Sequence, residues 1–176
     1  MPHSHHHSRC SAALALMAVA LAGAACSTNS PTASPTTIAP RSTTTTAAMT
    51  RAAAAARYLA IVKPYNAALI RFRDQANAWS ASLTNAQAAA EAQPVIAETT
   101  TTDNQLLALA QLYPAAATDL KAEVAASAAT SGDLGGLATV NLLDASSWQS
   151  QVSHDASVMA GAAATVRSDL GLPPVG

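Results

Sequence analysis

The sequence predicts an all-α protein: an antiparallel bundle of three or four helices, preceded by a signal peptide and a disordered tether rich in Ser, Thr and Pro. Apolar residues recur at alternating spacings of three and four, the pattern of helices packed on other helices. Alanine, the best intrinsic helix former, supplies about a quarter of the 176 residues. No segment has the strict apolar–polar alternation that is typical of a strand.

Residues 1–25 are organised like an export signal. The uncharged apolar run SAALALMAVALA at 11–22 follows Arg9 and ends in small residues. It is shorter than the roughly 18 apolar residues of a membrane-spanning helix. The histidines from His3 to His7 suggest metal binding, but they precede the apolar run and would leave with the signal. We therefore expect no metal site in the mature protein.

Cysteine usage singles out Cys26 as a lipidation site. The chain has two cysteines, and Cys10 falls inside the signal, so the mature chain cannot form an internal disulfide. An exported protein with one leftover thiol calls for an explanation, and acylation of Cys26 would consume the sulfur as a thioether. We predict a lipid-anchored protein on the extracytoplasmic face of the cell membrane, with the membrane as a partner through the anchor.

The stretch LAGAACSTNS around Cys26 resembles the signal and lipobox of bacterial lipoproteins. In that family a branched apolar residue lies three positions before the cysteine, and small residues fill the next two. Ala24 and Ala25 match the small positions, Ser27 is a common follower, and Gly23 departs from the pattern at the branched position. The alternative is plain secretion, because two small-x-small cleavage sites, ALA and AGA, precede the cysteine.

Residues 26–50 are predicted to hold the lipidation site and a disordered linker. Sixteen of the 24 residues at 27–50 are Ser, Thr or Pro, and only Arg41 is charged. Such a segment has too little apolar surface to offset the entropy cost of ordering. We interpret it as a tether that lifts the following domain off the membrane, with a composition that also suits O-linked sugars.

Residues 51–172 are predicted to form the bundle. Its first helix carries most of the large side chains, and the register continues through Pro64, so we expect a kink there rather than an end. The series is Tyr58, Val62, Tyr65, Leu69, Phe72, Ala76, Trp79, Leu83, Ala86 and Ala90. Pro94 is expected to begin the next helix. The inward face of that helix is Val95, Thr99, Thr102, Leu106, Leu109 and Tyr113.

Proline and glycine also delimit the two remaining helical segments. Pro114 opens or kinks a segment that the glycines at 132–136 end in a loop. The final helix has Asp144 as its N-cap and Gly171 as its terminating glycine, and the prolines that follow prevent continuation. The inward residues are Leu120 and Val124 in the first segment, and Val152, Ala156, Met159, Ala163, Val166 and Leu170 in the second.

A second resemblance covers most of residues 50–174. The segments YLAIVKPYNAAL, TVNLLDASSW and SDLGLPP are similar to uncharacterised, Ala-rich lipoproteins of actinobacteria. That resemblance implies an envelope location. It implies no activity and assigns no functional residues.

Composition argues against catalysis and against a nucleic-acid partner. Charged residues are 11% of the chain, the net charge is −1 and no basic patch occurs. His154 is the one histidine after the signal, so neither a metal site nor a histidine-dependent nucleophile set is available. Asp119 and Glu123 are expected on a solvated face. We expect no enzyme and no cofactor.

Five aromatic residues form the candidate ligand or partner surface: Tyr58, Tyr65, Phe72, Trp79 and Trp148. Helical spacing already explains the first four as core packing. The alternative is an apolar cavity between the helices, which Trp148 and Met159 would also line. We therefore expect an interaction or scaffolding module that binds an envelope protein. The alternatives are a carrier of a lipid or small apolar ligand, and a plainly secreted soluble helical protein.

Overall fold

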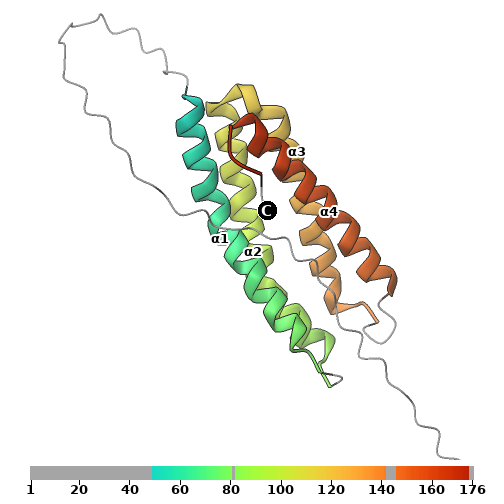
Figure 1. The fold of residues 1–176 in the computed structure, drawn as a ribbon. Helices are drawn as coiled ribbons and strands as arrows, with labels where there is room; N and C mark the ends of the chain where they lie inside the picture. Colours follow the sequence, from blue (N-terminus) through green and yellow to red (C-terminus); the bar gives the residue numbers. More distant parts are fainter. Residues whose placement is uncertain (1–48, 81, 142–145, 175–176) are drawn as a thin grey trace, which may run out of the picture.

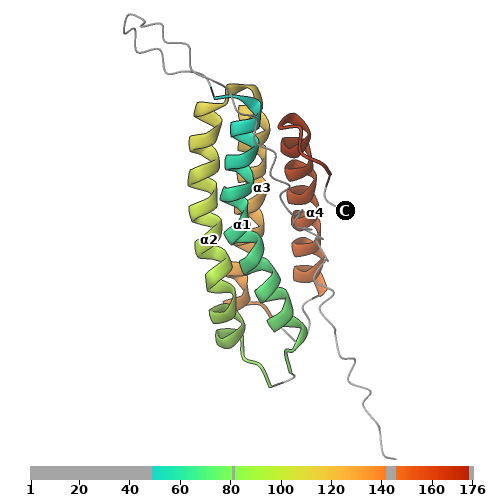
Figure 2. The same cartoon turned by 60° about the vertical axis from the view of Figure 1, so that its left-hand side comes forward.

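The computed structural model describes residues 49–80, 82–141 and 146–174, and across these ranges the chain is helical with no strand. Four helices run up and down, each antiparallel to the one before it (Figures 1 and 2). They are α1 (Arg51–Asn77), α2 (Asn85–Leu112), α3 (Ala117–Gly135) and α4 (Ser146–Asp169). Short 3-10 turns flank α3: η1 (Pro114–Ala116) and η2 (Gly136–Ala138). The predicted all-α bundle is confirmed, with four helices. The predicted signal, Cys26, most of the tether and Asp144 lie outside the described residues.

Helix α1 begins where the sequence offers a cap and continues through its proline. The side chain of Thr50 accepts a hydrogen bond from the backbone N–H of Ala53 at 3.2 Å, which satisfies one of the free donors of the first turn. Pro64 lies inside the helix, as the continuous register predicted.

The expected boundary between the first two helices was wrong. The sequence series ran on to Ala90 with a new helix at Pro94, but α1 ends at Asn77 and α2 already begins at Asn85. A capping box fixes that start. The backbone N–H of Thr84 donates to Gln87 Oε1 at 2.9 Å, and the backbone N–H of Gln87 donates to Thr84 Oγ1 at 3.3 Å. Pro94 is accommodated inside α2.

The end of α4 is the one that the sequence indicated. Gly171 has a φ of +70°, a conformation that costs little only for glycine. The backbone N–H of Leu172 donates to Arg167 O at 2.8 Å, and that of Gly171 donates to Ser168 O at 3.0 Å. This pair of bonds is the Schellman termination. At the end of α3, by contrast, Gly132 still lies within the helix.

The core divides into two clusters along the bundle axis. The cluster nearer the start of α1 centres on Tyr58, Ile61, Val62, Leu106, Leu109, Leu120, Val166 and Leu170. The other centres on Tyr65, Phe72, Val95, Leu134, Leu137 and Met159, with buried alanines Ala68, Ala88 and Ala92 between them. Helices adjacent in sequence pack closely, whereas the backbones of α1 and α4 approach each other at few points. Long side chains therefore bridge α1 to α4.

Arg51 joins the start of α1 to the end of α4. Its Nε donates to Asp169 O at 2.7 Å and its Nη2 donates to Ser168 O at 2.8 Å. These carbonyls belong to the last turn of α4, where helical partners are lacking and cations are favoured. The chain thus enters and leaves the bundle at one end (Figure 1).

Two leucines on α2 give a matched test of this packing. Leu109 is fully buried, whereas Leu107 is 38% exposed. We expect Leu109→Ala to lower the free energy of unfolding by about 3 kcal/mol, because it removes buried methyl groups and leaves a cavity. Leu107→Ala should cost less than about 1 kcal/mol. Denaturant titration of both variants measures the difference, and equal losses would contradict the assigned faces of α2.

Candidate functional site

The predicted aromatic residues do not share one environment. Tyr58, Tyr65 and Phe72 are at most 6% exposed, so their rings pack inside the bundle. Trp79 and Trp148 are half-buried. Burial shows that core packing accounts for the three residues on α1. The two tryptophans keep part of their surface accessible.

The structure brings four of the five aromatic residues together. Tyr65, Phe72, Trp79 and Trp148 belong to one cluster, whereas Tyr58 lies in the other. Phe72 and Trp79 meet edge to face, with ring centroids 5.8 Å apart and an interplanar angle of 78°. Such pairs add attraction beyond the area they bury.

Four apolar side chains lie together with the core at the end of the bundle that holds the tryptophans. Trp79, Leu83, Val140 and Trp148 are half-buried there and pack on the core; we term these four residues the distal tip. Trp79 Nε1 donates to Glu91 Oε2 at 2.6 Å, and Trp148 Nε1 donates to Asp133 O at 2.9 Å.

The first residue of α2 and the segment after α3 are held together at this end. The side-chain amide of Asn85 donates to the backbone carbonyls of Leu137 and Val140. The distal tip lies at the opposite end of the bundle from the start of α1 and the end of α4 (Figures 1 and 2).

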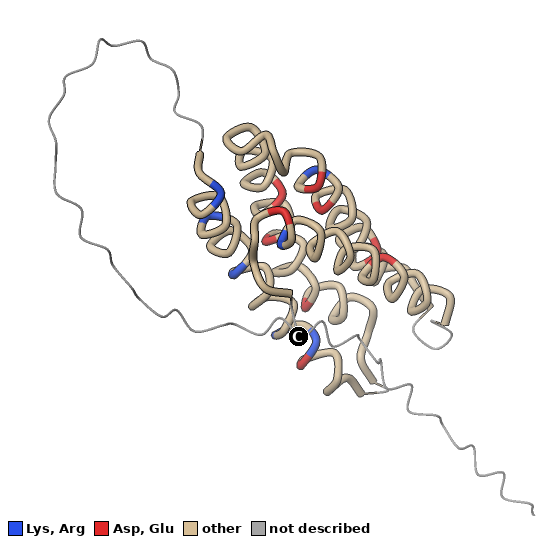
Figure 3. Tube along the Cα trace, turned by 45° about the horizontal axis from the view of Figure 1, so that its top comes forward, with Lys and Arg blue, Asp and Glu red and all other residues tan. Residues whose placement is uncertain are grey.

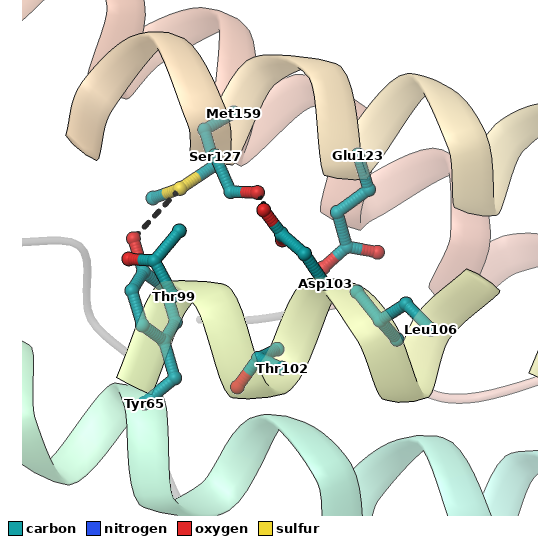
Figure 4. A pocket seen from close by; sticks show the side chains of 8 residues that line it. All are labelled: Tyr65, Thr99, Thr102, Asp103, Leu106, Glu123, Ser127 and Met159. Atoms are coloured by element: carbon teal, nitrogen blue, oxygen red, sulfur yellow. Dashed lines mark hydrogen bonds between the residues drawn. The ribbon is translucent and has the colours of Figure 1, made fainter. Parts of the chain in front are cut away.

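A polar layer crosses the middle of the bundle, and all four helices contribute to it. Its side chains surround a cavity of about 10 Å³ (Figure 4). The lining residues are Tyr65, Thr99, Thr102, Asp103, Leu106, Glu123, Ser127 and Met159; we term them the central layer. A space of this size holds about one water molecule. It cannot enclose an acyl chain or a small apolar ligand.

Glu123 is the most unexpected member of the central layer. The sequence placed it with Asp119 on a solvated face, which was wrong for Glu123, because its side chain is only 7% exposed. Tyr58 Oη donates to Glu123 Oε1 at 2.9 Å, whereas Oε2 is buried without a protein partner. Burial raises the pKa of Glu123 to about 7, although the Tyr58 hydrogen bond opposes that shift.

A sequence signal for this burial exists. Glu123 lies three residues after Leu120, and the series continues through Ser127, Thr130 and Leu134 at spacings of four, three and four. All five residues are buried. The series did not stand out as a buried face because three of its five residues, Glu123, Ser127 and Thr130, are polar.

Asp103 is the second carboxyl group of the central layer. Ser127 Oγ lies 2.5 Å from Asp103 Oδ1. Burial raises the pKa of Asp103, and the contact with Ser127 works against that rise. Across the layer, Tyr65 Oη contacts Met159 Sδ at 3.1 Å and so links α1 to α4.

Charged residues elsewhere are few and lie dispersed along the helices (Figure 3). Burial, and a hydrogen bond with Asp155, raise the pKa of Asp133 to about 6. A hydrogen bond with Asp169 raises the pKa of Asp119. His154 is exposed on α4. In the described ranges, no group of three or more His, Cys, Asp or Glu side chains is arranged to hold a metal ion.

Comparison with protein-family models finds no match for the chain, and comparisons with curated proteins and with solved structures find none either.

Tyr58 gives a test of the buried carboxyl group. We expect Tyr58→Phe to destabilise the bundle by about 1–3 kcal/mol near pH 8, because an ionised Glu123 loses its hydrogen-bond donor. The loss should shrink near pH 5, where Glu123 is protonated. Denaturant unfolding at both pH values measures it, with Tyr113→Phe at a half-buried position as control. A loss that does not change with pH would contradict this role of Tyr58.

Proposed function

We propose that this protein is a membrane-tethered extracytoplasmic module that binds a partner protein through its distal tip. The anchor is acylated Cys26, and the Ser/Thr/Pro-rich segment is the tether. One observation supports this arrangement above the others. Helix α1 begins and α4 ends at one end of the bundle (Figure 1), whereas Trp79 follows the end of α1 and Trp148 lies in the first turn of α4. A tether attached at that end would direct the distal tip away from the membrane.

The chemistry of the distal tip suits a protein partner. Tryptophan is enriched at binding hot spots, where a large apolar ring and one N–H group combine burial with direction. Trp79 and Trp148 are half-buried, and each already has its N–H group bonded within the bundle. Their remaining exposed surface is therefore apolar, and an apolar partner surface would cover it.

The internal packing favours binding over transport of an apolar ligand. The cavity of the central layer is about 10 Å³, far below the 300–1,000 Å³ of typical ligand pockets. Of the aromatic rings, Tyr65 lines only this small cavity, and Phe72 is packed in the core. We infer that the bundle acts as a scaffold rather than as a carrier or a catalyst.

A lipid anchor is consistent with the described helices. None of them is both long enough and apolar enough to cross a bilayer. A diacylated cysteine would supply two chains, and two chains anchor stably where one is marginal. The 24 residues from 27 to 50 could extend over about 80 Å at most, so the module would reach partners well above the membrane surface.

The anchor is tested by the intact mass of the mature protein. We expect the wild-type chain to begin at Cys26 with added acyl mass and to fractionate with membranes. Cys26→Ala should release the protein into the medium, whereas Cys10→Ala, within the signal, should leave the anchored form unchanged. A mature chain that starts at Gly23 or Ala25 without added mass would show plain secretion and contradict the anchor.

The distal tip is tested by photo-crosslinking in intact cells. Ser82 is exposed beside the tip and Ala115 is exposed at the opposite end, in η1. We expect a photoreactive residue at Ser82 to crosslink one discrete protein, and the same residue at Ala115 to give no such product. Trp148→Ala in the Ser82 background should abolish the crosslink. Equal crosslinking from both ends would contradict the assignment of the tip.

A further inference from the structure

The central layer holds a buried oxygen atom that nothing in the bundle satisfies. Glu123 Oε2 is buried without a hydrogen-bond partner, in a side chain that is 7% exposed. A buried carboxyl oxygen left unpaired is costly. Glu123 lines the cavity of about 10 Å³ together with Asp103, Thr99 and Thr102, as Figure 4 shows. The cavity thus offers about the space of one water molecule beside the side chain that carries this unpaired oxygen.

The contacts of the Ser127 hydroxyl group indicate a proton on Asp103. Its hydroxyl carries one hydrogen atom, yet Oγ lies 2.9 Å from Val124 O and 2.5 Å from Asp103 Oδ1. Both neighbours are acceptors if Asp103 is ionised, so one of the two contacts would then lack a hydrogen. A proton on Asp103 satisfies both contacts, because Asp103 then donates to Ser127 while Ser127 donates to Val124.

We propose that the cavity of the central layer binds one water molecule that donates to Glu123 Oε2, and that Asp103 and Glu123 together hold one proton across this site. Placed on Asp103, the proton is donated to Ser127, and Glu123 accepts from Tyr58 and from the water. Placed on Glu123, it is donated to the water. In either arrangement the two carboxyl groups carry one negative charge, and neither has a buried, unpaired oxygen facing the cavity.

The site makes the stability of the bundle depend on pH. Three groups on the other helices act on Glu123: Tyr58 on α1, Asp103 on α2 and, at longer range, Arg167 on α4. Burial raises the pKa of Tyr65 on α1, and the negative charges of Asp103 and Glu123 raise it further. Arg167 favours the ionised form of Glu123, but burial and Asp103 favour the protonated form. A carboxyl group with a raised pKa in the folded state stabilises the fold at low pH, and this stabilisation is lost as the pH rises through the folded-state value. For Glu123 the stability of the fold therefore falls over a pH window from 4.5, the ordinary pKa, to about 7, the pKa in the folded state.

The first test is denaturant unfolding of the full chain across this window. The shift from 4.5 to about 7 predicts that the unfolding constant rises on the order of 10²-fold between about pH 4.5 and about pH 8. Glu123→Gln should remove most of that rise, and Asp103→Asn should reduce it. Glu98→Gln, on α2 five residues before Asp103, is the matched control and should keep the wild-type rise. A Glu123→Gln variant with the wild-type pH dependence would overturn the proposal.

The second test needs no variant to fold, because it begins with the wild-type protein. At about pH 6.5 its infrared spectrum should contain the carbonyl band of a buried, protonated carboxyl group. That band should persist in Glu98→Gln and lose the contribution of the central layer in the double variant Asp103→Asn, Glu123→Gln, which keeps only the contribution of Asp133, whose pKa is also raised. Absence of this band from the wild-type spectrum would overturn the proposal that the two carboxyl groups share a proton.

The water site has a separate test in the salt dependence of stability. If sodium raises the free energy of unfolding at about pH 8 and an equal concentration of choline does not, the cavity binds a cation, and the water site is overturned.

Discussion

The scarcity of large side chains is the constraint on which the rest of this bundle depends. Alanine buries little area, so an alanine-rich helix gains stability only where its backbone closely approaches another helix. Sequential helices achieve this through Ala68, Ala88 and Ala92, which are almost fully buried. The buried aromatic rings of the described core, Tyr58, Tyr65 and Phe72, all project into the interior from α1. One helix thus supplies the aromatic part of a core that all four helices share.

The polar central layer is a consequence of this shortage of large apolar side chains. A core with few large apolar residues leaves room at mid-height, and polar side chains occupy it instead. One carboxyl oxygen of Glu123 is hydrogen-bonded to Tyr58, and Asp103 is hydrogen-bonded to Ser127. Buried polar groups that are well paired can fix one packing arrangement, and poorly paired ones weaken it. The proposed water and shared proton would complete the pairing of this layer and tie the fold to the acidity of its surroundings.

The sequence predicted the elements that have strong local causes. The fold class follows from helical spacing, and the end of α4 follows from Gly171 and the prolines after it. The turn at 78–84 was missed because the apolar heptad pattern continues across it without glycine or proline. The Thr84–Gln87 capping box was a signal in the sequence that could have located the start of α2. Glu123 was missed because three of the five residues on its buried face are polar, so the helical spacing of that face carried no apolar pattern. The packing of Trp79 and Trp148 on the same core cluster also depends on tertiary structure, since 69 positions separate them in the sequence.

Residue-resolved hydrogen exchange tests the central claim that α1 ties the bundle together. If the side chains of α1 fill the common core, amides around Tyr58, Tyr65 and Phe72 should exchange only through global unfolding, with the same free energy as amides around Leu106 and Leu109 in α2. The account predicts one shared slowest class that includes both helices. Separate opening of α1 at a clearly lower free energy, with α2, α3 and α4 still protected, would contradict it.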